Sequence, residues 1–195
     1  TIAQQLGLKH LVIASEELSN EKFVANSPDR CYHCKKEMFG IFQDIAREHG
    51  FPWVLDGSNF DDQFDHRPGI QAGDELGIIS PLKEAGLTKE NIRELSREMG
   101  LPTWDKPSFA CLASRFPYGE RITEEKLSMV EEAEDYLCSL GINIFRVRHH
   151  GDLARIEVPR KDFLHIMERS ADIDKRLCTI GYRYVALDLK GFRSG

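Results

Sequence analysis

The sequence predicts an α/β protein in which a parallel sheet with flanking helices is followed by a small α+β domain. Strand-like and helix-like segments alternate through the first half of the chain. The second half has a different order: a helix, a two-strand hairpin, another helix and a last strand. Residues 101–119 contain three prolines and little periodicity, which is typical of a loop between domains. We therefore expect domains at residues 1–115 and 116–195.

The first half provides two apolar runs and two amphipathic segments. Residues 10–14 (HLVIA) and 53–55 (WVL) are expected to be buried strands. Apolar residues spaced by three and four predict a helix from about residue 34 to 48. Thr88 is a good N-cap for another helix, which stops at Gly100. The apolar residues expected to point inward from that helix are Ile92, Leu95 and Met99.

The second half has clear local signals. Thr123 and two following glutamates indicate the start of a helix. Its expected apolar side comprises Leu127, Val130, Ala133, Leu137 and Leu140. Strands are expected at 143–149 and 153–158, with Gly151-Asp152 as a tight hairpin turn. A helix at 162–168 and a strand at 182–188 complete this domain, and Cys138 and Cys178 are expected in its core.

Composition excludes several classes of protein. The chain has 195 residues, 41% hydrophobic and 30% charged, as in ordinary globular proteins. No apolar run approaches the ~20 residues that cross a bilayer, so we expect a cytoplasmic protein without a membrane partner. The net charge of -6 argues against non-specific nucleic-acid binding. Five cysteines, an odd number spread along the chain, favour metal or redox chemistry over a disulfide framework.

Cys31 and Cys34 form a C-x-x-C motif at the expected start of a helix. The positive end of a helix dipole favours thiolates, the reactive and metal-binding form. The pair could be a redox dithiol, half of a zinc site, two ligands of an iron–sulfur cluster, or two incidental thiols. Because no second C-x-x-C exists, a zinc site of four cysteines is not expected.

Cys111 lies in a loop of small residues between Lys106 and Arg115. Nearby positive charge suits a thiolate, so Cys111 is a candidate nucleophile. The alternative is a buried structural cysteine.

Asp56, Gly57 and Asn59 follow the second expected strand. In an open α/β sheet, ligands bind at the carboxyl ends of the strands. Aspartate and asparagine can bind a ribose, a base or Mg²⁺, and glycine allows close approach of the backbone. The same residues also form ordinary turns.

The hairpin gives a sharper prediction. A two-residue turn at 151–152 places Arg148 opposite Arg155, and Arg146 opposite Glu157, on one surface. Guanidinium groups suit phosphate and carboxylate, so this surface could be an anion pocket or a solvated face with ion pairs. Glu134 lies on the inward side of the preceding helix, where it could pair with these arginines or bind a cation.

These features together resemble a known family. The chain is similar to the LarE family of ATP-dependent sulfur transferases, which make the nickel-pincer nucleotide cofactor of lactate racemase. The resemblance covers essentially the whole chain. It rests on PDRCYHCK (28–35), DGSNFDD (56–62), DHRPG (65–69), residues 80–119 with CLASR, RVR (146–148), ARIEV (154–158) and DLKGFRSG (188–195).

The resemblance implies a Rossmann-like adenine nucleotide alpha hydrolase (PP-loop) domain and a cytoplasmic enzyme that uses ATP and Mg²⁺. In that family, ATP adenylylates a carboxylate of pyridinium-3,5-dicarboxylate mononucleotide, and sulfur then replaces the activated oxygen. Some members sacrifice one cysteine, and others hold a [4Fe-4S] cluster on three. Cys31, Cys34 and Cys111 fit the three-cysteine kind, with Cys111 also the candidate catalytic residue.

The resemblance also assigns the remaining site residues. Arg146, Arg148 and Arg193 would hold the substrate phosphate. Ser114, Glu134 and Glu157 would line the substrate site, and Asp56, Gly57 and Asn59 the nucleotide site. The family's Ser-Gly-Gly-x-Asp-Ser motif is absent, so the chain is expected to begin after it. By analogy we expect a homo-oligomer, with a hexamer as one candidate, and the sulfide source is unknown.

Two other functions fit parts of the sequence. A tRNA thiolation enzyme shares the ATP chemistry and a C-x-x-C with a distant cysteine, but the acidic balance counts against it. The second is a zinc- or cluster-binding protein that has lost its ATPase activity and uses only the cysteines.

Overall fold

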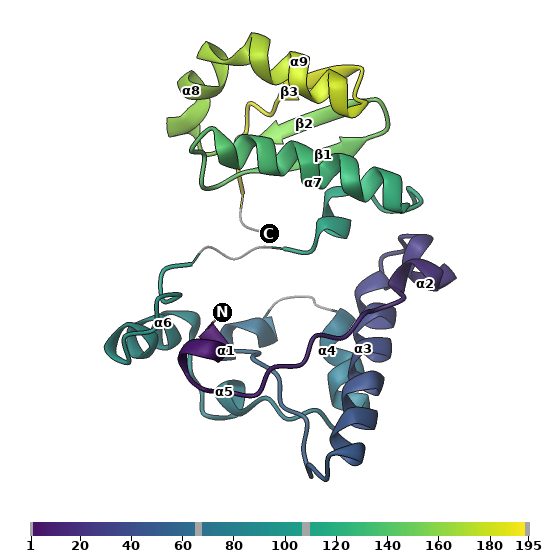
Figure 1. The fold of residues 1–195 in the computed structure, drawn as a ribbon, viewed down its shortest axis with the longest axis vertical. Coiled ribbons are helices and arrows are strands. Elements are labelled where there is room, and N and C mark those ends of the chain that lie inside the picture. Colours follow the sequence, from purple (N-terminus) through teal and green to yellow (C-terminus); the bar gives the residue numbers. More distant parts are fainter. Residues whose placement is uncertain (1, 65–67, 107–109, 194–195) are drawn as a thin grey trace.

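The computed structural model describes residues 2–64, 68–106 and 110–193. Within these ranges the chain is a mixed α/β protein with a three-stranded sheet in its C-terminal half (Figure 1). The elements in the first half are α1 (Ile2–Gln5), η1 (Glu17–Ser19), α2 (Glu21–Val24), α3 (Arg30–Glu48), η2 (Phe60–Phe64), α4 (Pro68–Glu75), α5 (Pro81–Glu84), α6 (Lys89–Glu98) and η3 (Leu112–Arg115). The elements that follow are α7 (Glu124–Ser139), β1 (Arg146–His150), β2 (Leu153–Glu157), η4 (Arg160–Asp162), α8 (Phe163–Glu168), α9 (Ser170–Ile180) and β3 (Tyr184–Leu187).

The C-terminal sheet confirms the predicted hairpin. β1 pairs antiparallel with β2, and β3 joins β2 in parallel after the crossover through α8 and α9. The register places Arg148 opposite Arg155 and Arg146 opposite Glu157, as the two-residue turn requires. Helix α9 was not predicted from the sequence.

One face of this sheet forms the main core. Alternate strand residues are buried, and in Figure 1 the helices α7 and α9 lie along the sheet. The buried side chains of this cluster are Ala133, Leu137, Ile142, Val147, Ala154, Ile156, Val158, Ile166, Ile173, Leu177 and Tyr182. The opposite face carries the arginines.

Helix α7 begins as predicted, because the Thr123 side chain accepts a hydrogen bond from the backbone N–H of Lys126. Its buried residues are Val130, Ala133, Glu134 and Leu137. The prediction that Cys138 and Cys178 are core residues is wrong, since both are exposed. Cys138 follows buried Leu137 and lies about 100° further round the helix, outside the buried stripe.

The first half departs from the prediction. Residues 10–14 have no regular structure, and Val12 is 87% exposed, so the expected buried strand is wrong. The segment 53–55 contributes one parallel bridge, between Leu55 and Ile79, and Trp53 and Leu55 are largely exposed. The expected parallel sheet therefore does not form within the described residues. A buried strand needs neighbouring strands along its edges and helices over its faces, and the sequence pattern of the strand does not supply them.

The helices of the first half match better. α3 covers the predicted helix and begins one turn earlier, so the C-x-x-C lies within its first turns. α6 has the expected N-cap, a capping box between Thr88 and Asn91. The prediction that Leu95 and Met99 point inward is wrong, because both side chains are exposed.

A second apolar cluster joins the two halves. Phe23 and Val24 of α2 pack with residues from η3, the loop after it and α7: Ala113, Phe116, Ile122 and Val130. Backbone bonds reinforce this contact, from Ile122 N–H to Val24 O and from Gly119 N–H to Asn26 O. No helix in the described ranges is long and apolar enough to traverse a bilayer.

Candidate active site

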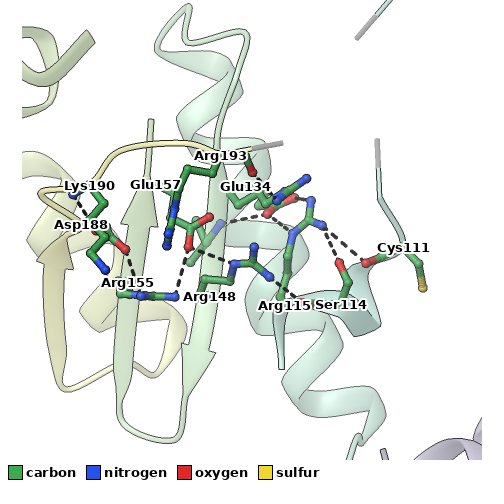
Figure 2. Close-up of polar contacts among 12 residues, drawn as sticks. Cys111, Ser114, Arg115, Glu134, Arg148, Arg155, Glu157, Asp188, Lys190 and Arg193 are labelled. Carbon is green, nitrogen blue, oxygen red and sulfur yellow. Dashed lines mark hydrogen bonds and ion pairs between the residues drawn. The ribbon is translucent and has the colours of Figure 1, made fainter. Parts of the chain in front are cut away.

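The sheet face opposite the main core is built around one carboxylate. Glu157 Oε1 accepts hydrogen bonds from Arg148 Nε and Arg155 Nη2, each at 3.1 Å, and Arg155 Nη1 reaches Asp188 Oδ2 at 2.9 Å (Figure 2). We call Arg146, Arg148, Arg155 and Glu157 the arginine face. Glu157 is 4% exposed, and its negative charge holds Arg148 and Arg155 together. Without it, these two directly opposed cations would repel each other.

Arg146 differs from Arg148 and Arg155, because its bonds to described residues do not include a carboxylate. It stacks over the Phe192 ring, 4.7 Å from guanidinium carbon to ring centroid, and donates to the Arg193 carbonyl at 3.0 Å. Burial, together with the positive charges of Arg148 and Arg115, lowers the pKa of Arg146 below its ordinary value. An anion placed there would relieve that repulsion. Arg193 contributes its carbonyl, and its side chain is exposed.

Glu134 has a partner that the sequence did not indicate. Arg115 forms a bidentate ion pair with Glu134, from Nε to Oε1 at 2.6 Å and from Nη2 to Oε2 at 3.0 Å. Glu134 Oε1 also accepts the backbone N–H of Val147 in β1, at 2.9 Å. Both side chains are largely buried, at 3% and 11% exposure. The structure thus makes Glu134 a brace between η3 and β1.

The same brace ties the Cys111 loop to the arginine face. Arg115 Nη1 donates to the Ser114 hydroxyl at 3.0 Å and to the carbonyls of Ala110 and Cys111 at 3.3 and 3.5 Å. Arg148 Nη1 donates to the Ser114 carbonyl at 2.7 Å. Figure 2 shows the Cys111 sulfur pointing away from these bonds, and the thiol is exposed. An exposed thiol is therefore held beside the arginine face.

Two of the three predicted cysteines, Cys111 and Cys34, line neighbouring hollows. A hollow of about 660 Å³ is lined by residues 15–19, Phe23, Cys111 and its neighbours, and Leu127. A second, of about 200 Å³, is lined by Cys34 and shares Ser15 and Glu17 with the first. We call these the Cys111 hollow and the Cys34 hollow.

Cys34 is held as a thiol. Its Sγ donates to Glu17 Oε1 at 3.3 Å. Burial raises the pKa of Cys34 to about 12, and Glu17 and the nearby Cys111 and Cys31 add to the shift. Cys31 is exposed.

These side chains do not form a metal site as they stand. Within the described ranges no group of three or more histidine, cysteine, aspartate or glutamate side chains could hold a metal ion. The donor chemistry of three thiols suits iron, but the Cys34 thiol is hydrogen-bonded to Glu17. The present arrangement therefore does not fit a [4Fe-4S] cluster.

The residues predicted to bind nucleotide form a separate loop. Asp56 accepts hydrogen bonds from the Ser58 N–H, the Ser58 hydroxyl and the Ser80 hydroxyl. Burial raises its pKa, but these bonds and Lys35 outweigh burial and leave it below the ordinary value. Asn59 Oδ1 accepts the Asp61 N–H, as in an ordinary turn, and Gly57 has open space where a Cβ would be. Parts of three quoted motifs, at 65–67, 107–109 and 194–195, lie outside the described residues.

Comparison with known proteins places the chain in a family. No protein-family model matches it. It is 41% identical over 198 residues to the pyridinium-3,5-bisthiocarboxylic acid mononucleotide synthase of Lactiplantibacillus plantarum, covering 100% of this chain and 71% of that protein.

The chain belongs to the LarE family of these synthases. Two uncharacterized proteins are also similar. One, from Synechocystis, is 44% identical over 195 residues, covering 99% of this chain and 73% of its own length. The other, from Methanocaldococcus jannaschii, is 33% identical over 174 residues, covering 89% and 68%. As a LarE family member the chain is a sulfurtransferase enzyme.

Sequence reasoning left three of these contacts unpredicted. The Arg115–Glu134 pair spans 19 positions, and the Arg155–Asp188 bond spans 33. The third, the side chain of Arg30, reaches across 83 positions. No local pattern indicates such partners. The one available signal was the position of Arg115 in CLASR and of Arg30 directly before Cys31.

Proposed function

We propose that this protein is an ATP-dependent sulfur transferase that converts carboxylates of pyridinium-3,5-dicarboxylate mononucleotide to thiocarboxylates. The name of the Lactiplantibacillus relative, which matches across this whole chain, states the corresponding product. One observation carries the proposal: Arg115 and Arg148 tie the backbone of the Cys111 loop to the arginine face. A bound anionic mononucleotide would thus lie beside an exposed thiol.

The arginine face would bind the substrate phosphate through Arg146 and Arg148, with Arg193 closing the site. A carboxylate oxygen of the bound substrate attacks the α-phosphorus of ATP. The bond from the α-phosphorus to the oxygen bridging the α- and β-phosphates breaks, and pyrophosphate leaves. Mg²⁺ would neutralise the phosphates. The resulting acyl-adenylate has AMP as a good leaving group, so a sulfur nucleophile at the Cys111 loop forms the C–S bond as the C–O bond to AMP breaks.

The sulfur source divides the proposal into two routes. If Cys111 is sacrificed, its thiolate forms a thioester. Loss of the Cα proton then breaks the Cβ–S bond, which leaves dehydroalanine on the enzyme and thiocarboxylate on the substrate. Alternatively, Cys31, Cys34 and Cys111 hold a [4Fe-4S] cluster, a role supported by the thiol count and by the proximity of Cys34 to the other two. That cluster requires Cys34 to leave Glu17.

The finer architecture is also part of the proposal. Residues 1–115 would belong to a PP-loop ATP-pyrophosphatase-like, Rossmann-like domain, with Asp56, Gly57 and Asn59 near the nucleotide. Residues 116–195 would form the substrate and assembly domain of a homo-oligomer, a hexamer by analogy.

The test is turnover of the purified protein with ATP, Mg²⁺ and the dicarboxylate mononucleotide, followed by mass spectrometry. We expect thiocarboxylate, AMP and pyrophosphate, with Arg148→Gln weakening substrate binding and the exposed Arg121→Gln leaving it unchanged. A protein that forms neither AMP nor thiocarboxylate would contradict the proposal.

The two sulfur routes are separated on the same samples. A loss of about 34 Da at Cys111 after turnover identifies a sacrificial cysteine. Anaerobically purified protein with iron and acid-labile sulfide, lost on Cys31→Ala, Cys34→Ala or Cys111→Ala, identifies a cluster. Iron-free protein excludes the cluster route.

A further inference from the structure

Arg30 lies between the two segments that carry the candidate cysteines. It is the first residue of α3 and directly precedes Cys31. Despite its charge it is 4% exposed, and buried arginines are rare unless their donors are satisfied. The sequence patterns gave it no role.

The guanidinium of Arg30 bonds to three separate pieces of chain. Nη1 donates to the Asn26 side-chain oxygen, in the turn before α3, and to the Ala113 carbonyl at 2.8 Å. Nη2 lies 3.7 Å from Cys31 Sγ. Ala113 follows Cys111 by two positions, so one side chain connects the C-x-x-C turn directly to the Cys111 loop.

The turn before α3 is shaped to hold this connection. Asn26 has a φ of 52°, a left-handed conformation that asparagine tolerates better than most residues, and it is fully buried. Its side-chain nitrogen donates to the Pro117 carbonyl at 2.8 Å, while its side-chain oxygen receives Arg30. The two side chains together connect α3 to Ala113 within η3 and to Pro117 in the loop after it.

A simple structural ion pair does not explain Arg30. Within the described residues no carboxylate pairs with it, and its charge is met by a carbonyl, an amide oxygen and a thiol. A buried charge without a counter-ion is costly, whereas an apolar side chain of similar volume would fill the space at lower cost. A forked donor, in contrast, fixes the direction of two acceptors at once.

We propose that Arg30 is a positioning residue that holds Cys31 and Cys34 beside Cys111. The functional meaning of this arrangement rests on the proposed function, because these are the thiols proposed to deliver sulfur. The geometry itself is independent of turnover. Without Arg30, the two thiol-bearing segments would be joined only by the apolar cluster and by the backbone bonds at Val24 and Asn26, so the distance between their thiols would vary more.

The experiment measures thiol proximity in the full chain with all five cysteines. A short bifunctional thiol reagent is added, and mass spectrometry after digestion gives the yield of links between the peptide with Cys31 and Cys34 and the peptide with Cys111. The same protein in urea gives the baseline for an unpositioned chain. Circular dichroism confirms that each variant is folded.

Arg30→Met removes the two directed hydrogen bonds and should reduce the yield clearly below the parental value, though not to the urea baseline, because the apolar cluster of Phe23, Val24 and Ala113 remains. Arg30→Lys keeps the charge but cannot reach Asn26 and Ala113 together, so its yield should also fall. The matched control is Arg121→Met, which breaks the exposed two-pronged pair between Arg121 and Glu21 of α2, another contact between the halves. That variant should keep the parental yield.

A folded Arg30→Met protein with the parental yield would overturn the proposal. If Arg30→Met does not fold, Asn26→Gly decides, because glycine accepts the positive φ and only the side-chain bonds are lost. Asn26→Gly should lower the yield, and a parental yield would overturn the proposal. Because no ATP or substrate is present, a failure here is distinct from a failure of sulfur transfer.

Discussion

Glu134 shows what a buried ion pair costs when one partner is removed. In Glu134→Gln, Arg115 stays buried at 3% exposure without a counter-charge, and Val147 N–H has a weaker acceptor. We expect the free energy of unfolding to fall by about 3 kcal/mol, since breaking a buried pair leaves an uncompensated charge. Urea denaturation followed by circular dichroism measures this change.

The same helix supplies the control. Glu132, two residues away, pairs with Arg176 at 3.3 Å, and both side chains are roughly half exposed. Glu132→Gln should change stability by at most about 0.5 kcal/mol. Equal effects of the two substitutions would mean that the Arg115–Glu134 brace contributes no more than a surface pair.

Cys34 carries a pH prediction. Its raised pKa, near 12, means that the thiol stays protonated and reacts slowly with iodoacetamide at pH values where exposed Cys138 reacts readily. Glu17→Gln removes a negative charge that disfavours the Cys34 thiolate, and it should therefore move the alkylation profile of Cys34 to lower pH. Alkylation of each cysteine against pH, read by mass spectrometry, tests this. A wild-type Cys34 profile that overlays that of Cys138 would contradict it.

The same shift affects stability with a definite sign. The folded-state pKa of Cys34 lies above the ordinary value of 9.0, so folding favours the protonated thiol. The stabilisation is complete below pH 9.0 and is lost as the pH rises towards about 12. A Cys34→Ala variant should therefore show a shallower loss of stability over that pH window.

At the scale of elements, the turn after β3 positions one end of the arginine face. Gly191 has a φ of 76°, and an added Cβ would lie 3.0 Å from the Val158 carbonyl. Gly191 N–H bonds to the Asp188 carbonyl, and the next residue, Phe192, stacks under Arg146. We expect Gly191→Ala to cost more than the left-handed strain of about 1 kcal/mol, and to weaken mononucleotide binding.

Gly86 separates strain from crowding. Its φ is 69°, and nothing lies within 4 Å of an added Cβ, so Gly86→Ala should show the left-handed strain alone. Urea midpoints and mononucleotide titration compare the two variants. If Gly86→Ala is as costly and as harmful to binding, the turn at Gly191 has no special role.

The elements that the sequence predicted share one property, which is local determination. The hairpin register follows from the turn at 151–152, and the starts of α6 and α7 follow from Thr88 and Thr123, each within four residues of its partner. The strands at 10–14 and 53–55 failed because a strand depends on neighbours distant in sequence.

The site was predictable to the same extent. The pairing of Arg148 with Arg155 follows from the position of the two-residue turn. In contrast, Glu134 lies 19 positions from Arg115, and Ala113 lies 83 positions from Arg30. Such pairs are fixed by packing, and a single sequence does not encode them in any short pattern. The set of three cysteines was implied by the family resemblance, whereas the hydrogen bond from Cys34 to Glu17 was not predicted.

At the scale of the whole molecule, apolar burial is unevenly distributed. The cluster of α7–α9 and the sheet contains eleven buried residues. In the first half, residues 30–106 bury the apolar side chains of Phe39, Ala46 and Ala72, while Trp53 is 66% exposed. Since buried apolar area is the main source of stability, the C-terminal half should be the more stable part.

This asymmetry predicts the order of unfolding. Both tryptophans of the chain, Trp53 and Trp104, lie in the first half, so their fluorescence reports that half alone. We expect the fluorescence midpoint at a lower urea concentration than the loss of hydrogen-exchange protection in β2. Leu137→Ala, at a fully buried site in α7, should cost about 2–5 kcal/mol and lower only the β2 midpoint. If Leu137→Ala lowers both midpoints equally, the two halves unfold as one cooperative unit, coupled through the contacts of Phe23, Val24 and Phe116. The expected domain boundary near residue 115 would then not separate two units of stability.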